Sequence, residues 1–225
     1  MFNVVCCWTG PKNEKEYTID YVHKLYRGIE RNIDMEFEFY VMTDKPELFD
    51  DDKIKPIPYE GVTEGWWAKP YLFKYEFKGP VLYLDIDVVV IGNITKLIEA
   101  CMKQDEFVMF RDPTTRWGNS SIMFWNGYDR YKHIYTEFAK EPEIWMSKFN
   151  RNYSGNYGDQ AYIVFQNLDI IDLKELGFDQ WWCDSSIVYD PGVDNAQFII
   201  LAGPKQKPHN VDRTKVTDLV KEHWI

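Results

Sequence analysis

The sequence predicts an α/β, Rossmann-like domain with a mostly parallel central sheet flanked by helices. Two short apolar runs, residues 2–8 and 37–42, lie on either side of a segment with helical periodicity. A right-handed crossover makes two such strands parallel neighbours. A third run, residues 81–91, is apolar apart from two aspartates, which suits a strand covered on both faces. With 225 residues, of which 45% are hydrophobic, we expect one domain, residues 1–225.

The N-terminal half supplies the first strands and helices of this pattern. Tyr17, Tyr21 and Leu25 recur at helical spacing and predict an amphipathic helix over 14–32. Residues 50–65 contain three consecutive aspartates, two prolines and two glycines, which is typical of a solvated connection. Residues 66–77 are helix-like, although Pro70 is tolerated only near the first turn.

The C-terminal half continues the alternation after the central strand. We expect helices at 94–103, 128–149 with a break at Pro142, 158–165 and 213–222, and strands at 106–110, 119–125, 187–189 and 197–201. Residues 111–118 are predicted to be a loop. The Tyr, Asn, Gly and Ser residues of 150–157 favour a mobile lid.

The central strand carries Asp85 and Asp87 at spacing i, i+2. A buried unpaired carboxylate is costly, so the two need a cation, a cage of hydrogen bonds or an exit at the end of the strand. In extended chain both side chains point to one side, where their oxygens can meet one hard divalent ion. The alternative is that both simply begin a polar turn.

Composition and net charge indicate which partners and which cellular compartment to expect. The net charge of −10 is a poor match to nucleic acid or an anionic membrane. Aromatic residues make up 17% of the chain, enough to line a pocket for a polar, ring-shaped ligand as well as the core. The four cysteines lack metal-ligand spacing, and we find neither a signal peptide nor an apolar run of ~20 residues. We therefore expect reduced thiols in a cytoplasmic protein without a transmembrane segment.

Five short motifs follow one another along nearly the whole chain: Trp67-Ala68-Lys69, Leu82-Tyr83-Leu84-Asp85-Ile86-Asp87, Asn119-Ser120-Ser121-Ile122-Met123, Gly158-Asp159-Gln160 and Gly203-Pro204-Lys205-Gln206-Lys207-Pro208. In this order they resemble the nucleotide-sugar glycosyltransferases of the GT-A fold, closest to the glycogenin-like family 8 group. The resemblance implies a single GT-A domain and a nucleoside-diphosphate sugar as donor, with UDP favoured and GDP possible.

The resemblance also implies roles for the motif residues. Asp85 and Asp87 match the D-x-D pair that holds Mn²⁺ or Mg²⁺, and Asp85 would also touch the ribose. Lys69 and Lys207 match cations on the diphosphate, where charge grows as the leaving group departs. Of these, Lys207 is also expected to act in catalysis.

The donor sugar and the nucleoside are expected to meet a further set of polar residues. The resemblance assigns donor-sugar contacts to Asn119, Ser120, Asp159 and Gln160, of which Asp159 and Gln160 are the catalytic candidates. Asp159 could alternatively be a plain helix N-cap. Trp8, Thr9 and Asp44 end the first two strands and are candidates for contacts with base and ribose.

One residue departs from the family pattern. Family 8 enzymes take a third metal ligand from a His shortly before the Gly…Lys-Pro motif, whereas here residues 198–203 contain none. His209, just after the motif, or water could complete the metal ligands, or metal binding could be weak.

The predicted function is metal-dependent transfer of a hexose, with retention of configuration, from a nucleoside-diphosphate sugar to an unidentified glycan, lipid or protein acceptor. One alternative is an inactive sugar-nucleotide-binding protein of the same fold, which the missing His favours. The other is a phosphohydrolase of the haloacid dehalogenase type, which also has a D-x-D at a strand. That class needs a second acidic residue soon after Gly158-Asp159, and residues 162–167 supply none.

Overall fold

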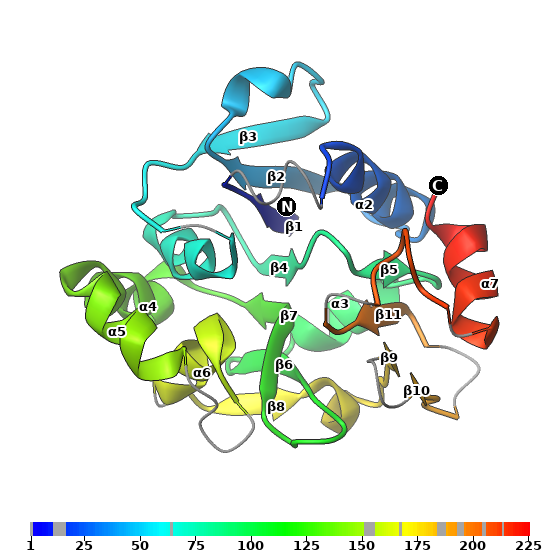
Figure 1. The fold of residues 1–225 in the computed structure, drawn as a ribbon. Helices are drawn as coiled ribbons and strands as arrows, with labels where there is room; N and C mark the ends of the chain where they lie inside the picture. Colours follow the sequence, from blue (N-terminus) through cyan, green and yellow to red (C-terminus); the bar gives the residue numbers. More distant parts are fainter. Residues whose placement is uncertain are drawn as a thin grey trace.

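The fold is built on a seven-stranded sheet with the order β3-β2-β1-β4-β7-β6-β8 (Figure 1). The structure, a computed structural model, describes residues 2–10, 17–63, 65–150, 156–166, 168–183, 188–192, 196–203, 206–212 and 214–225. The strands of this sheet are β1 (Phe2–Trp8), β2 (Phe37–Thr43), β3 (Ile54–Pro58), β4 (Val81–Leu84), β6 (Phe107–Arg111), β7 (Gly118–Trp125) and β8 (Ile170–Asp172). β7 runs antiparallel to both of its neighbours, and the other pairs in the sheet are parallel. The predicted mostly parallel sheet is thereby confirmed.

A smaller sheet of four strands lies beside one face of the first. Its order is β10-β9-β11-β5, with β5 (Val89–Val90), β9 (Trp181–Cys183), β10 (Val188–Tyr189) and β11 (Phe198–Leu201). β11 runs antiparallel to β5 and parallel to β9. Because β5 follows β4 after one turn, the chain passes from the large sheet to the small one at Asp85–Asp87.

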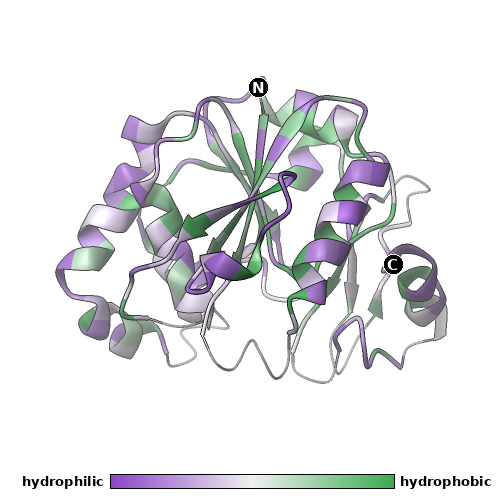
Figure 2. Cartoon of the chain, turned by 90° about the horizontal axis from the view of Figure 1, so that it is seen from above, coloured by the Kyte–Doolittle hydropathy of each residue, from purple (hydrophilic) through white to green (hydrophobic). Residues whose placement is uncertain are grey.

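Helices cover both faces of the large sheet (Figure 1). They are α2 (Asp20–Arg31), α3 (Thr95–Cys101), α4 (Tyr128–Lys140), α5 (Pro142–Phe149), α6 (Gly158–Phe165) and α7 (Thr214–His223), with 3₁₀ helices η1 (Pro46–Leu48), η2 (Gly65–Lys74) and η3 (Leu173–Leu176). One buried cluster packs α2, α3, α7 and the small sheet against one face, and a second packs η2, α4, α5 and α6 against the other. Figure 2 shows the same division, with hydrophobic strands between helices whose outer faces are hydrophilic.

Several predicted elements need correction. The central run is not one strand but β4 and β5, because the intervening residues turn the chain into another sheet. The stretch 50–65 is not only a connection, since it contains β3, whose two prolines are accommodated because β3 is the edge strand. The helix predicted over 14–32 is observed as α2, with residues 17–19 outside it and residues 14–16 outside the described residues, and the segment around Pro70 is 3₁₀ rather than α-helical. β8, β9 and η3 had no counterpart in the prediction.

Some predictions fall partly or wholly outside the described residues. They concern Pro11 in the first turn, residues 151–155 of the proposed lid, Ile187 at the tenth strand, and Pro204 and Lys205 in the last motif. Within the described residues no helix has the length and apolar character that crossing a membrane requires. The four cysteines are buried and free.

Candidate active site

The aspartate pair lies in the turn that joins the two sheets. β4 ends at Leu84, and the backbone N–H of Asp85 donates to the carbonyl oxygen of Ser121 on β7 at 2.9 Å. The N–H of Val88 closes the turn on the carbonyl oxygen of Asp85 at 3.1 Å. The carboxylates therefore leave the sheet at the carboxyl end of a central strand, where α/β sheets bind ligands.

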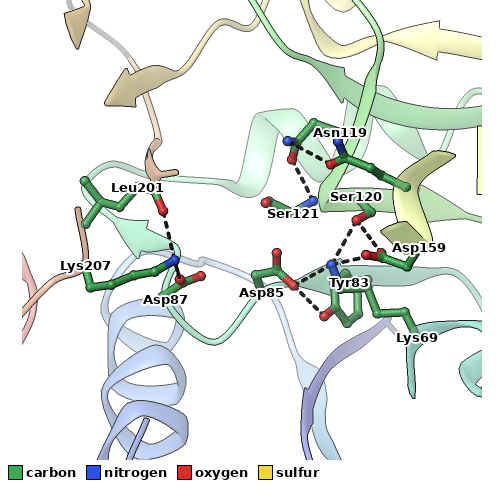
Figure 3. Close-up of polar contacts among 11 residues, drawn as sticks. Lys69, Tyr83, Asp85, Asp87, Asn119, Ser120, Ser121, Asp159, Leu201 and Lys207 are labelled. Carbon is green, nitrogen blue, oxygen red and sulfur yellow. Dashed lines mark hydrogen bonds and ion pairs between the residues drawn. The ribbon is translucent and has the colours of Figure 1, made fainter. Parts of the chain in front are cut away.

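Lys69 lies between Asp85 and Asp159 and binds both carboxylates (Figure 3). Its Nζ lies 2.9 Å from Oδ1 of Asp85 and 3.2 Å from Oδ2 of Asp159, and it donates to Oγ of Ser120 at 2.9 Å. Ser120 in turn donates to Oδ2 of Asp159 at 2.6 Å. Lys69 is only 4% exposed, so one buried ammonium serves two carboxylates, one from the turn after β4 and one from α6.

These contacts move the two carboxyl pKa values in opposite directions. Burial raises the pKa of Asp85, but Lys69 and hydrogen bonds from Tyr83 and Ser121 outweigh it and leave that pKa below its usual value. Burial also dominates at Asp159, and there Lys69 and Ser120 do not offset it, so its pKa is raised. Burial alone would lower the pKa of Lys69, yet the two carboxylates raise it. Asp85 is therefore the more firmly ionised partner of the pair.

Asp159 owes its position to the residue before it. Gly158 has φ 73°, in the left-handed region that a side chain would strain, and α6 begins there. Asp159 is 4% exposed and bonds Ser120 and Lys69 rather than a free backbone N–H of its own helix. The N-cap interpretation is therefore wrong for Asp159.

Lys207 binds the second aspartate from the opposite side of the turn. Its Nζ lies 2.6 Å from Oδ2 of Asp87 and donates to the carbonyl oxygen of Leu201 at 3.2 Å. Burial lowers the pKa of Lys207, but the attraction of Asp87 more than offsets it and the pKa is raised. The ammonium also lies 5.5 Å from the ring centroid of Tyr17. Figure 3 shows the two lysine–aspartate groups on either side of the turn.

The donor set at the turn suits a hard divalent cation in part. Asp85 and Asp87 provide carboxylate oxygens, the ligands that Mn²⁺ and Mg²⁺ accept, and one oxygen of each already binds a lysine. Among the described residues no three His, Cys, Asp or Glu side chains form a group that could hold a metal. The two aspartates fit a metal whose other ligands come from a diphosphate and water.

His209 does not complete such a group in the described part of the chain. Its Nδ1 is hydrogen-bonded to the hydroxyl of Tyr21 on α2, and the two rings meet edge to face. Trp224 also packs against Tyr21, with ring centroids 5.2 Å apart. This anchors the segment after Lys207 to the first helix, which is a structural role.

The donor-sugar candidates on β7 and α6 are brought together. Nδ2 of Asn119 donates to Oε1 of Gln160 at 3.3 Å, and Oδ1 of Asn119 accepts from the backbone N–H of Ser121 at 2.9 Å. Asn119, Ser120 and Gln160 therefore lie in one polar row beside Asp159. Nearby, Trp66 and Tyr157 are exposed and pack edge to face, 6.4 Å between centroids.

The three nucleoside candidates lie at the ends of β1 and β2. Asp44 accepts from the backbone N–H of Gly10 at 3.1 Å. Thr9 is buried, and within the described structure its Oγ1 has no hydrogen-bond partner. Trp8 is also buried, and its indole N–H donates to the carbonyl oxygen of Tyr17 at 2.7 Å. Asp44 is exposed and open to a ligand contact, whereas Thr9 and Trp8 are buried beside it.

Two residues of the site were missed from the sequence. The hydroxyl of Tyr83 donates to Oδ1 of Asp85 at 2.7 Å, and its spacing of two residues along the strand could have revealed it. Tyr17, assigned to the helix, instead lies outside it beside Lys207. The sequence carries no local signal for that contact.

Comparison with known proteins rests on structure alone. No family model and no curated protein matches the chain. The galactosyltransferase LgtC, in complex with donor and acceptor sugar analogues, matches 98% of this chain and 96% of its own, with a TM-score of 0.65 and 13% identity. An active-site mutant of LgtC gives a TM-score of 0.67 at 14% identity over the same shares of both chains.

A further match is the glycosyltransferase GlyE of Streptococcus pneumoniae TIGR4. It has a TM-score of 0.55 and 16% identity, over 77% of this chain and 45% of GlyE. The expected fold is confirmed because LgtC is matched along almost its whole length. The chain has the GT-A fold of these glycosyltransferases.

Proposed function

We propose that this chain is a metal-dependent glycosyltransferase that moves a sugar from a nucleoside-diphosphate sugar, with UDP favoured and GDP possible, to a glycan, lipid or protein acceptor. The observation that carries the proposal is the pairing of Lys69 with Asp85 and of Lys207 with Asp87 at one edge of the sheet. Similarity to LgtC, whose structure contains donor and acceptor sugar analogues, supports it.

The leaving diphosphate is the group that a metal and Lys207 would serve, whereas Lys69, which the family resemblance places on the diphosphate, is buried against Asp85 and Asp159. Asp85 and Asp87 would hold Mn²⁺ or Mg²⁺, which supplies Lewis-acid stabilisation of the departing diphosphate. Lys207 is bound to Asp87 beside the turn. Its ammonium would exchange this partner for a phosphate oxygen as negative charge develops on the diphosphate. Lys69 would keep Asp85 ionised and correctly oriented, because it is buried and already binds two carboxylates.

The donor sugar would lie against the row formed by Asn119, Ser120, Asp159 and Gln160. Asp159 is oriented by two hydrogen-bonding partners, so it would hold a sugar hydroxyl rather than move freely as a base. Thr9 and Asp44 would contact ribose or base, and the buried ring of Trp8 would support that wall. We propose hexosyl transfer with retention, and a cytoplasmic location that the buried free thiols support.

A second candidate is a sugar-nucleotide-binding protein without turnover. The absence of a third metal-binding side chain beside Asp85 and Asp87 among the described residues favours it. Such a protein would gain thermal stability from UDP with Mn²⁺ but would consume no sugar nucleotide. The GT-A fold leaves the phosphohydrolase alternative without support.

The test is a screen of UDP- and GDP-sugars with Mn²⁺, reading release of nucleoside diphosphate and, in parallel, the shift in melting temperature. We expect one UDP-sugar to be hydrolysed slowly without an acceptor and faster when an acceptor is added. A melting shift without any turnover would select the binding protein. Neither a shift nor turnover with any donor would refute both proposals.

A further inference from the structure

A second polar site lies beyond the candidate active site, at the end of β6. It is an open pocket of about 320 Å³, lined by Arg111, Arg116, Asp172, Lys174 and Glu175. Three cations and two carboxylates meet there, in a chain whose net charge is −10. Cations thus outnumber carboxylates among the lining residues, whereas acidic residues outnumber basic ones in the whole chain.

The two carboxylates of the pocket are hydrogen-bonded to backbone N–H groups at the start of η3. Oδ1 of Asp172 accepts from the backbone N–H of Lys174 at 3.2 Å, and Glu175 accepts from the N–H of Asp172 at 3.1 Å. This reciprocal capping box fixes both acids. Lys174 is also occupied, because its Nζ lies 2.9 Å from Asp179. The two arginines remain as donors for a ligand.

The donors of Arg111 are only weakly used inside the protein. Its nearest acceptors are the carbonyl oxygens of Ile170 at 3.4 Å and Arg116 at 3.5 Å, and Asp172 lies 3.9 Å from its Nε. These distances are long for N–H···O bonds. For Arg116 no residue in the described ranges pairs with the guanidinium, which is exposed. Two planar donor groups therefore face the pocket largely unsatisfied, and guanidinium groups bind carboxylate and phosphate in a bidentate manner.

The loop that carries Arg116 is held in one conformation. Arg116 has φ 64°, the sole positive φ among the described non-glycine residues, and its N–H donates to the carbonyl oxygen of Asp112 at 2.9 Å. The carboxylate of Asp112 accepts from the N–H groups of Thr114 and Thr115 at 2.7 and 2.9 Å. The backbone of the turn is thus held before a ligand binds, so that binding has to order only the side chain of Arg116.

Strand register connects this pocket with the active site. Arg111 pairs with Gly118, and three residues later on β7 the carbonyl oxygen of Ser121 accepts from the N–H of Asp85. Three residues of strand span about 10 Å. Along the chain, Trp117, 38% exposed, joins Arg116 of the pocket to the start of β7, where the polar row begins at Asn119. A ligand anchored in the pocket could thus reach the place where the donor sugar would react.

We infer that Arg111 and Arg116 form an oxyanion-binding subsite for the acceptor, which carries a phosphate or carboxylate group on the part that is not glycosylated. Its role toward an acceptor rests on the proposed transfer function, whereas oxyanion binding does not. An acidic protein repels anions at long range, so a local pair of guanidinium groups is what such an acceptor requires.

Binding is tested by calorimetry with glucose 6-phosphate, glucuronate and glucose as probes. We expect glucose 6-phosphate or glucuronate to bind and glucose not to bind. The difference in affinity between glucose 6-phosphate and glucuronate shows whether the subsite prefers phosphate or carboxylate. Arg116→Gln should lower the affinity for the charged probe at least tenfold, which is ~1.4 kcal/mol of binding free energy. Lys221→Gln removes an exposed charge on α7 and should leave the affinity unchanged.

Two results would overturn the subsite. One is that wild type and Arg116→Gln bind the charged probe with equal affinity. The other is binding that survives Arg116→Gln but is lost in Lys207→Met, which would place the anion at the donor site. Arg116 is exposed, so its replacement should leave the fold intact, and circular dichroism of the variant checks this.

The acceptor role is tested separately once a donor is identified. In wild type the ratio of kcat/KM for a phosphorylated or carboxylated acceptor to that for its neutral analogue should exceed one, and Arg116→Gln should bring the ratio near one. If no donor is consumed while oxyanion binding is retained, the transfer function has failed and the subsite stands. If transfer occurs with an unchanged ratio in the variant, the acceptor role is refuted.

Discussion

Lys207 and Asp87, 120 residues apart in the chain, form an ion pair of 2.6 Å in which each side chain is only 14% exposed. The ammonium thereby occupies an oxygen that the proposed metal would use. A metal and Lys207 consequently compete for Asp87 until a diphosphate provides the ammonium with another partner. Removal of the ammonium should therefore change the affinities for the metal and for the diphosphate in opposite directions.

Lys207→Met is expected to raise the affinity of the free protein for Mn²⁺ several-fold and to lower the affinity for UDP in the presence of Mn²⁺. The first effect follows from removal of the competing cation, and the second from loss of a charge on the diphosphate. Isothermal titration with Mn²⁺ alone and then with UDP measures both. Lys221→Met serves as the control for an exposed lysine, and unchanged Mn²⁺ affinity in Lys207→Met would contradict the competition.

Asp87→Asn is expected to abolish Mn²⁺-dependent UDP binding and turnover while the fold stays intact. The substitution keeps the volume of the side chain and removes one ligand charge at the end of a strand. Binding is measured by calorimetry and folding by the unfolding midpoint in urea. Retention of wild-type affinity and rate would eliminate the metal proposal.

Lys69→Met is expected to destabilise the protein by about 3–5 kcal/mol at neutral pH, because it leaves two buried carboxylates without their cation. The destabilisation should shrink as the pH falls. In the variant, burial without a cation raises both carboxyl pKa values, so the native state takes up protons before the unfolded chain does. The free energy of unfolding in urea at pH 5 and pH 8 tests this.

The wild type should show the opposite trend at Asp85. Its pKa is depressed in the native state, so its contribution to stability is present above the unfolded carboxyl pKa and is lost as the pH falls through the native value. Asp159, with a raised pKa, opposes this trend in part. A Lys69→Met protein whose destabilisation did not change with pH would argue against the buried pair.

His209→Ala is expected to change Mn²⁺ affinity by less than about tenfold, the lower end of what loss of metal-supporting groups costs. The histidine is bound to Tyr21 rather than grouped with the aspartates in the described structure. Its loss should instead lower the thermal stability of the contact between α2 and the segment after Lys207. A much larger loss of metal affinity would show that His209 moves to the metal on binding.

Local pattern was sufficient for most of the fold. Apolar runs located β1, β2, β6, β7 and β11, and helical periodicity located α3, α4, α5 and α6, since in each case burial requires the pattern itself. It was not sufficient for β3, whose prolines and polar neighbours are acceptable because β3 is the edge strand of the sheet formed by the described residues. Nor could it detect β8 and β9, which are three residues each.

The sequence alone determined which charged residues matter, because Asp85 and Asp87 interrupt an apolar run and cannot remain buried without partners. Tertiary structure decided what those partners are. Lys69 meets Asp159, and Lys207 meets Asp87, across separations in sequence that no local pattern encodes. It also decided that the two carboxylates belong to separate lysine pairs. The chain turns at these residues to pass from one sheet to the other, and that turn, which the i, i+2 spacing does not reveal, places each carboxylate beside its own lysine.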